Sequence, residues 1–145
     1  KKKIIIIGKS NIKQFDQKKY ETEFYRNFIS DKKLKIFFHD KNKFEGYKTI
    51  LQSKVIVGAT SSLLRESFAF NKKVLCCKYI KDKNGILFPS EGICLLKNRS
   101  YQEFENRLNK ILKMSYSNYI KGIKNIDDLY FKRKNALKVL HNKFD

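Results

Sequence analysis

No apolar run in this sequence approaches the ~20 residues that a membrane-spanning helix needs. The basic start is followed by only four apolar residues, Ile4–Ile7, whereas the apolar part of a secretory signal has roughly 7–15 residues. Hydrophobic residues make up 41% and aromatic residues 14% of the chain, which excludes a disordered protein. The sequence therefore predicts a soluble globular domain.

Cysteine is scarce, and its spacing matches no metal site. The three cysteines, Cys76, Cys77 and Cys94, cannot all pair within one chain, and no Cys-x-x-Cys or Cys/His pattern of a zinc site is present. Cys76 and Cys77 belong to the apolar run Val74–Cys77, where free cysteine behaves as a small buried hydrophobe. We therefore expect free core cysteines and a reducing compartment, the cytoplasm.

Acidic residues are few: 14 Asp and Glu stand against 33 Lys and Arg, which gives a formal net charge of +19. Such an excess attracts phosphates, nucleic acids and acidic membrane surfaces. Nucleic-acid binders rely on arginine and cluster their charge on one face, whereas here nearly all basic residues are lysines scattered over every segment. An A+T-rich coding bias also produces a chain rich in Lys, Asn and Ile, so the charge permits an anionic partner without identifying one.

Short apolar runs alternate with amphipathic stretches along the chain. The runs are apolar at consecutive positions, which is typical of parallel strands covered by helices on both faces. In the stretches between them apolar residues recur every three or four positions, and one such stripe, Tyr20, Phe24 and Phe28, is expected to face the core. The expected strands are Ile4–Ile7, Leu34–Phe38, Val55–Val57, Val74–Cys77 and Ile93–Leu96, and the expected helices between and after them are Tyr20–Ile29, Tyr47–Leu51, Ser62–Phe70 and Tyr101–Leu112.

Local signals mark the last third of the chain. Ser100 and Glu103 form the Ser-x-x-Glu pattern of a capping box, which predicts a helix start directly after Ser100. The segment Asp82–Gly92 holds the only proline and three turn signals, so we expect a loop there. The C-terminal part is expected to contain helices without a further strand, Tyr116–Ile123 and Asp128–Leu140.

This order of elements predicts an α/β fold: a Rossmann-like three-layer sandwich with a mostly parallel sheet of about five or six strands and a helical C-terminal tail. We expect residues 1–115 to form the Rossmann-like domain and residues 116–145 to form the tail. The sequence has no initiator Met and reaches a strand-like run within three residues. We therefore expect it to be part of a longer protein whose N-terminal domain is missing.

Ligands bind open parallel sheets at the carboxyl ends of the strands. The most informative such position follows Val55–Val57, where the small residue Gly58 is followed by the hydroxyl residues Thr60, Ser61 and Ser62 at the start of an expected helix. The unpaired N–H groups of a helix N-terminus favour an anion, and small side chains let a phosphate approach the backbone. This turn is therefore a candidate phosphate site.

Glu66 lies one helical turn beyond Ser62, where its carboxylate could reach past the phosphates to a ribose diol. A simpler interpretation remains open: Ser61 or Ser62 only caps the helix, and Glu66 only lies near the favourable end of the helix dipole.

Two further candidate positions follow the first two expected strands. Gly8, Lys9 and Ser10 lack the spacing of a Walker A loop, but they could offer an amide and an ammonium group to a phosphate; a solvated turn is the alternative. His39 could contact a base ring or act as a general base, and the alternative is a histidine with only a structural hydrogen bond.

The Thr60-Ser61-Ser62-x-x-x-Glu66 pattern lies between a buried strand and a helix, and Lys72-Lys73-Val74 then leads into the next strand. This arrangement resembles the C-terminal half of GT-B glycosyltransferases. Similar stretches occur in bacterial surface-polysaccharide transferases and in CDP-glycerol glycerophosphotransferases. The resemblance is close from Ser53 to about Tyr79, and it covers roughly residues 2–115 in the order of the elements.

The resemblance implies that this half of the enzyme holds a nucleotide-diphosphate sugar for transfer to a surface-polysaccharide or glycolipid acceptor. It implies that the three hydroxyl residues after Gly58 line the diphosphate and that Glu66 binds the donor ribose. It also implies that the segment Gly8–Ser10 approaches the phosphates and that His39 lies near the nucleotide base.

The resemblance assigns no catalytic residue. The Arg/Lys-x-x-x-x-Glu pair of retaining members is not clearly present, although Arg65 or Lys78 could serve, and the base of inverting members comes from the N-terminal half. The isolated domain is therefore expected to bind donor without turnover. No metal or other cofactor is expected, because GT-B enzymes need none and no Asp-x-Asp pair is present.

The expected partners are the nucleotide-sugar donor, a saccharide or lipid-linked acceptor and the missing N-terminal domain. We expect a cytoplasmic protein, and the lysine-rich surface would favour peripheral association with the anionic inner face of the plasma membrane. A CDP-glycerol-type glycerophosphotransferase domain shares the same turn. The alternatives from other classes are a basic nucleic-acid-binding α/β module, the less expected reading, and a domain that binds nothing specific.

Overall fold

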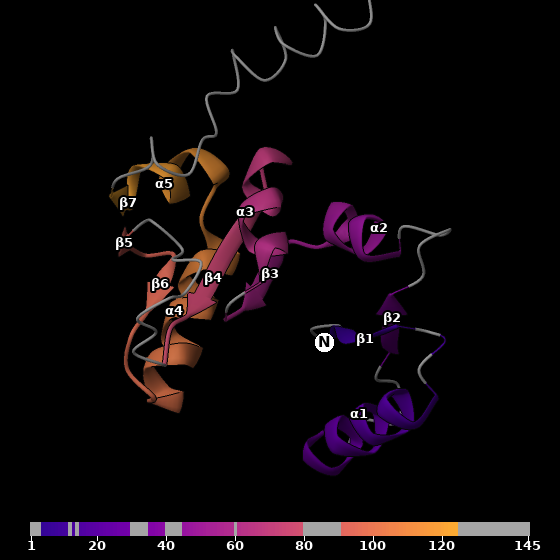
Figure 1. Ribbon diagram of the computed structural model, residues 1–145. Helices are drawn as coiled ribbons and strands as arrows, with labels where there is room; N and C mark the ends of the chain where they lie inside the picture. The colour runs from indigo at the N-terminus through magenta and orange to yellow at the C-terminus, as the bar shows by residue number, and fades with distance from the viewer. Residues whose placement is uncertain are drawn as a thin grey trace, which may run out of the picture. The chain divides into compact units, whose positions relative to one another are not determined.

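The computed structural model in Figure 1 describes residues 4–11, 13, 15–29, 35–39, 45–59, 61–79 and 91–124. The chain divides into two compact units, Lys1–Gln52 and Ser53–Asp145. Helices alternate with parallel strands in both units, so the predicted α/β class is confirmed. Among the described residues, no helix has the length and apolar character needed to cross a membrane.

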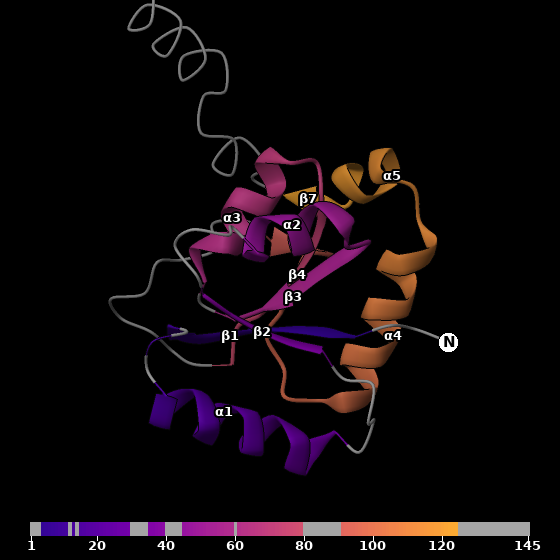
Figure 2. The ribbon, with the colours of Figure 1, turned by 90° about the vertical axis from the view of Figure 1, so that its right-hand side faces the viewer.

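The described part of the first unit contains two parallel strands and two helices. Strands β1 and β2 pair in register from Ile5 opposite Lys35 to Ile7 opposite Phe37, and pair again at Asn11 opposite His39 after a register shift. Helix α1 packs along β1 (Figures 1 and 2). The elements are β1 (Ile5–Asn11), α1 (Phe15–Phe28), β2 (Lys35–His39) and α2 (Glu45–Gln52).

Two expectations for the first unit are wrong. β1 continues to Asn11 because its pairing with β2 resumes beyond Ile7, so the segment Gly8–Ser10, expected in a turn, lies in a strand. The expected core stripe of α1 is also misplaced, since Tyr20 is 70% and Phe24 47% exposed. A different face of the helix covers the strands: the ammonium of Lys18 lies 5.6 Å from the centroid of the Phe38 ring.

The second unit is built on a three-stranded parallel sheet with the order β3-β4-β6. A short antiparallel pair, β5 with β7, lies beside α5 (Figure 1). The elements are β3 (Val55–Gly58), α3 (Ser62–Ala69), β4 (Lys73–Cys77), β5 (Glu91–Gly92), β6 (Leu95–Leu96), α4 (Tyr101–Lys113), α5 (Tyr116–Lys121) and β7 (Ile123–Lys124).

The expectation of no further strand after α4 is wrong, because Ile123–Lys124 forms β7. Its partner β5 occupies Glu91–Gly92, which were expected in a loop. Strands of two residues are too short to show hydrophobic periodicity, so only the folded chain reveals them. The rest of the expected loop from residue 82 and the expected helix Asp128–Leu140 lie outside the described residues.

The core of the second unit surrounds β4, whose last four residues, Val74–Cys77, are all buried. Residues from α3, α4 and α5 pack on it: Leu64, Phe68, Ile111 and Tyr119. Helix α5 therefore contributes to this core, while the predicted division into residues 1–115 and a tail of 116–145 stays a prediction. The three cysteines are free and buried, as predicted.

A tyrosine hydroxyl takes the place of a strand partner along part of β4. The fully buried Tyr119 accepts a hydrogen bond from the Val74 N–H (2.9 Å) and donates one to the Val74 carbonyl (2.7 Å). Strand β6 pairs only with Cys76 and Cys77, so it does not reach Val74. Burial raises the pKa of the Tyr119 hydroxyl, which therefore keeps the proton that it donates.

Lys73, the first residue of β4, closes the C-terminal end of α4. Its ammonium donates to the carbonyls of Ile111 (2.6 Å), Met114 (2.9 Å) and Leu112 (3.4 Å). These carbonyls lie where a helix leaves its acceptors unpaired and where its dipole favours a cation. Burial, with a smaller effect from the nearby Lys54, lowers the pKa of Lys73.

We expect Tyr119→Phe to lower the free energy of unfolding, because it leaves the Val74 N–H and carbonyl buried and unpaired. Each such group costs about 1–3 kcal/mol. Urea unfolding followed by circular dichroism measures the change. Tyr101→Phe, at a tyrosine of α4 that is 74% exposed, is the matched control and should keep the wild-type stability. Equal stability of Tyr119→Phe and wild type would contradict the role of the hydroxyl.

We expect the cysteines of the native protein to react slowly with a thiol reagent such as Ellman's reagent. Burial raises the pKa of Cys76 to about 11 and also raises that of Cys77, so the reactive thiolate is rare at neutral pH. In urea all three cysteines should react at the rate of an exposed thiol. A cysteine that reacts equally fast in the native and unfolded protein would show that it is not buried.

Candidate functional site

Helix α3 begins at the end of strand β3, as the candidate phosphate site requires. Ser61 is the N-cap residue of α3: its Oγ accepts a hydrogen bond from the Leu63 N–H (3.3 Å), and its carbonyl accepts one from the Leu64 N–H (3.1 Å). Ser61 thus has the capping role of the simpler interpretation. Because its oxygen is the acceptor in this bond, the hydroxyl proton can still be donated to a ligand.

Close packing holds the turn between β3 and α3. A Cβ atom on Gly58 would lie 3.2 Å from a methyl carbon of Leu64, so a larger residue there would press on the first turn of α3. On the other side, the Cys76 thiol donates to the Ala59 carbonyl over 3.1 Å. The turn is therefore anchored to both β4 and α3.

The second unit brings four of the predicted site residues together on one strand–turn–helix segment. Gly58 ends β3, Ser61 caps α3, and Ser62 begins it; both serines are exposed. Glu66 follows one turn later and is half-buried. Thr60 lies outside the described residues. Binding of a phosphate or a ribose by these residues stays a prediction.

Packing accounts for Gly8 in the first unit. Gly8 is buried in β1, and a Cβ atom there would lie 2.6 Å from a ring carbon of Phe38 and 3.0 Å from a carboxylate oxygen of Glu21. Lys9 and Ser10 follow in the same strand. A glycine is therefore required for the contact between β1 and its neighbours, whether or not a ligand approaches.

His39 is the last residue of β2 and pairs with Asn11, the last residue of β1. These two positions form the carboxyl edge of the parallel pair, where the rule for open sheets places ligands. His39 and the segment Gly8–Ser10 belong to the first unit, whereas the turn before α3 belongs to the second. A single site that combines them stays a prediction.

Basic residues gather at the carboxyl edge of the three-stranded sheet. Because β3, β4 and β6 are parallel, the residues that follow them lie along one edge. Lys78 follows β4 directly, and its N–H donates to the Leu96 carbonyl (2.8 Å). Lys97 follows β6, and Arg99 comes two residues later and donates to the Tyr79 carbonyl (3.4 Å).

Of these residues only Lys78 was considered from the sequence, as a possible partner of a catalytic glutamate, and Lys97 and Arg99 were not selected as binding residues. The signal that could have found them is the cationic residues that follow each buried strand, once the strands are known to be parallel neighbours. Lys97 also pairs with Glu91 over 2.9 Å, and this hydrogen bond lowers the pKa of the Glu91 carboxyl. The edge thus carries a positive charge that is partly compensated at Lys97.

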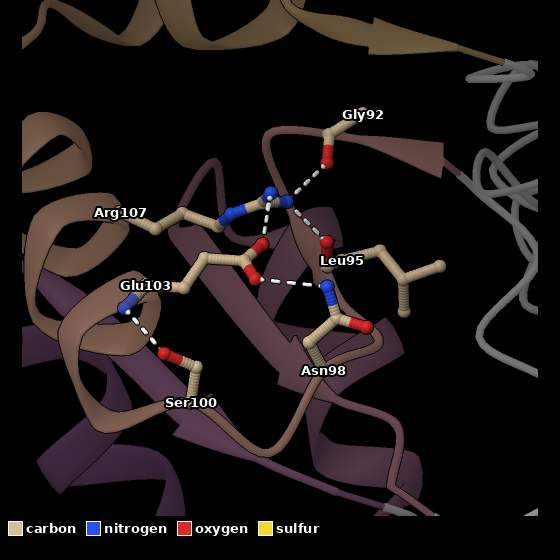
Figure 3. Close-up of polar contacts among 6 residues, drawn as sticks. All are labelled: Gly92, Leu95, Asn98, Ser100, Glu103 and Arg107. Carbon is tan, nitrogen blue, oxygen red and sulfur yellow. Dashed lines mark hydrogen bonds and ion pairs between the residues drawn. The ribbon is translucent and has the colours of Figure 1, made fainter.

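Arg107 forms a second polar cluster, between α4 and the strands β5 and β6 (Figure 3). Its guanidinium donates to the Gly92 carbonyl (2.9 Å) and to the Leu95 carbonyl, and it pairs with the Glu103 carboxylate (2.8 Å). The cluster connects α4 to β5 and β6.

Glu103 completes this cluster. Its other carboxylate oxygen accepts from the Asn98 side chain (3.1 Å), and its N–H donates to the Ser100 Oγ (3.2 Å), as Figure 3 shows. The predicted N-cap at Ser100 is confirmed. In a capping box this carboxylate would accept from the backbone N–H of the N-cap residue. Here the Glu103 carboxylate binds Arg107 and Asn98 instead.

Metal ligands would have to come from clusters of carboxylates, imidazoles or thiolates. Within the part of the chain that the structure describes, His, Cys, Asp and Glu form no group of three or more that could hold a metal ion. The expectation that no metal or other cofactor is needed stays a prediction.

Comparison of the chain with family models, with curated proteins and with solved structures found no match. The function is therefore argued from the turn between β3 and α3 and from the charge around it.

Proposed function

We propose that this chain is the donor-binding domain of a GT-B-type glycosyltransferase. It would hold a nucleotide-diphosphate sugar for transfer to a surface-polysaccharide or glycolipid acceptor. The observation that carries the proposal is the N-terminus of α3, placed by Ser61 directly after the parallel strand β3. Helix N-termini at the carboxyl ends of parallel strands are where nucleotide phosphates bind in α/β folds.

The proposed domain is a Rossmann-like three-layer sandwich with a mostly parallel sheet of about five or six strands. Two observations support it. The first unit contains the strand–helix–strand sequence β1-α1-β2 with parallel strands, and the second contains β3-α3-β4 with parallel strands. Residues 1–115 would form this domain and residues 116–145 its helical tail.

The charge distribution suits an anionic leaving group. The Ser62 N–H at the start of α3 and the Ser61 hydroxyl would donate to the diphosphate, and Lys78 and Arg99 follow neighbouring strands of the same sheet edge. Groups held in place before the reaction stabilise developing charge without reorganisation. Positive charge would thus fulfil the role of a metal ion at the leaving diphosphate.

Glu66 is proposed to bind the donor ribose. It lies one turn beyond Ser62 on α3 and is half-buried. A carboxylate accepts hydrogen bonds only, which matches the two hydroxyl donors of a ribose. Gly8, Lys9, Ser10 and His39 are proposed to complete the site at the phosphates and the base.

The acceptor and the catalytic base are proposed to come with an N-terminal domain. The chain alone would bind donor without transferring the sugar. The proposed location is the cytoplasmic face of the membrane, where the enzyme would meet a lipid-linked acceptor. A CDP-glycerol-type glycerophosphotransferase would use the same turn, and the nucleotide preference separates the two. The net charge of +19 favours a second candidate, nucleic-acid binding.

A thermal-shift screen of nucleotides and nucleotide sugars tests the proposal. A ligand that binds only the native state raises the melting temperature. We expect stabilisation by nucleoside diphosphates and their sugars with a preference for one base, whereas a preference for CDP-glycerol would select the glycerophosphotransferase. If no nucleotide stabilises the chain and DNA binds with a steep dependence on salt, nucleic-acid binding would replace the transferase.

We expect Glu66→Ala to weaken binding of the preferred nucleotide by about 1–3 kcal/mol, the scale of a lost hydrogen bond to a charged group. Isothermal titration calorimetry measures the affinity. Glu105→Ala, at an exposed position of α4, is the control and should bind like the wild type. An unchanged affinity for Glu66→Ala would remove this residue from the site.

A further inference from the structure

Lys78 lies at the carboxyl edge of the three-stranded sheet, one residue beyond β4. The hydrogen bonds to the neighbouring strand continue past the end of β4. The Cys76 N–H donates to the Cys94 carbonyl, and the Lys78 N–H donates to the Leu96 carbonyl, both over 2.8 Å. This regular spacing keeps the backbone extended up to Lys78. Because side chains alternate along an extended chain, those of Cys76 and Lys78 lie on the same face of the sheet.

This face carries the turn between β3 and α3. The Cys76 thiol donates to the Ala59 carbonyl of the turn (3.1 Å), and Cys76 is the register partner of Gly58, the last residue of β3. Burial raises the pKa of the Cys76 thiol, and the charge of Lys78 acts in the opposite direction, so the ammonium is within electrostatic reach of this thiol. Lys78 therefore lies beside the turn that forms the candidate phosphate site.

A second lysine lies on the other side of Lys78. The register of β4 with β6 ends at Cys77 opposite Leu96. Continued by one residue, it places Lys97 opposite Lys78. Neighbouring strands are ~4.8 Å apart, so the two lysines extend from adjacent positions at the sheet edge. Like charges that lie so close repel each other, and a nearby anion relieves this repulsion.

The Glu91 carboxylate lies near both lysines but pairs with only one. It forms an ion pair with Lys97 over 2.9 Å. This contact with Lys97 is the main cause of the lowered pKa of the Glu91 carboxyl, with smaller effects from Lys124 and Lys78. Among the residues that the structure describes, Lys78 has no ion-pair partner, although its side chain is half-buried. An anion on the turn side of Lys78 would supply the missing negative charge.

The proposed ribose ligand lies on the opposite side of α3 from the sheet. At 3.6 residues per turn, Glu66 is about 160° around the helix from Leu64 and Phe68, which belong to the core. Ser62 precedes Glu66 by one turn and lies on the same side. A donor whose ribose is bound by Glu66 would thus place its first phosphate at the start of α3 and extend its second phosphate toward the end of β4, where Lys78 lies.

Lysine suits a phosphate at this position. Its ammonium is a compact charge with three donors on a long, flexible stem, so it can follow a phosphate that is held mainly by other groups. Arg99 is the other basic residue without an ion pair among the described residues at this edge, but its guanidinium donates to the Tyr79 carbonyl (3.4 Å). Lys78 is therefore the cation best placed to reach a ligand on the turn.

We propose that Lys78 binds the second phosphate of the donor, the one that carries the sugar, and so makes the site selective for nucleoside diphosphates over nucleoside monophosphates. The turn before α3 would hold the first phosphate, which both classes of nucleotide possess. Only a diphosphate gains the contact with the ammonium. During transfer the same contact would stabilise the charge that develops on the leaving diphosphate. This inference rests on the proposed function.

Isothermal titration calorimetry of the full chain with UDP, GDP, CDP and ADP, each compared with its monophosphate, tests the proposal. For the base that binds most tightly, we expect the wild type to bind the diphosphate at least about tenfold more tightly than the monophosphate. Lys78→Gln should weaken diphosphate binding about tenfold or more, the scale of a lost hydrogen bond between charged groups. Its affinity for the monophosphate should equal that of the wild type.

Two further variants separate the contact from general effects of charge and folding. Lys110→Gln removes the same charge from an exposed position of α4 and should keep the wild-type preference. Lys78→Arg keeps a cation at the sheet edge and should retain most of the preference for the diphosphate. Circular dichroism confirms that each variant is folded.

The outcomes distinguish this inference from the proposed function. If the wild type binds nucleotides but does not prefer the diphosphate, this inference is overturned and donor binding stands. The same holds if Lys78→Gln changes the two affinities by the same factor or changes neither. If the wild type binds no nucleotide, the proposed function fails and this inference fails with it.

Discussion

The pairing of the Tyr119 hydroxyl with Val74 is the interaction on which the second unit depends. Strand β4 lies in the middle of the parallel sheet, but its neighbour β6 has only two residues and leaves Val74 without a strand partner on that side. The hydroxyl supplies both the donor and the acceptor that are missing. The Tyr119 ring, stacked on Phe68, fills the core at the same time, so one side chain joins α5, α3 and β4.

The candidate site depends on β4, because residues that follow Val74 in this strand hold the turn before α3. Cys76 donates to the carbonyl of Ala59, which fixes the turn before α3, and Leu64 packs from the first turn of α3 into the core. Since β4 is buried over its last four residues, the turn is held by a rigid element. A phosphate that binds there would meet donors already in place, which is the physical basis of the proposed function.

The sequence located the principal strands and helices with boundaries that differ by up to five residues, because hydrophobic periodicity is a local property. It also identified the N-cap Ser100 and left the N-cap of α3 open between Ser61 and Ser62; the side chains of Ser61 and Ser100 accept from N–H groups two and three residues later. It failed for β5 and β7, which are two residues each and exist only because they pair with each other. The sequence predicted the four site residues on β3 and α3 as one group because they are close in the chain. A site shared with β1 and β2 would require contacts between segments that are distant in the chain, which local patterns do not predict.

The chain's own sequence determined where strands and helices form, which residues begin α3 and α4, and how strongly positive the protein is. Only the tertiary structure decided which side of α1 is covered. Periodicity selected the stripe of Tyr20 and Phe24, but Lys18 and Glu21 lie against the strands instead. The Lys18 ammonium lies over the Phe38 ring, where a cation is attracted to the aromatic face, and the Glu21 carboxylate lies close to Gly8. Periodicity shows that a helix has two different faces, and the choice between them depends on the shape and chemistry of the surface it meets.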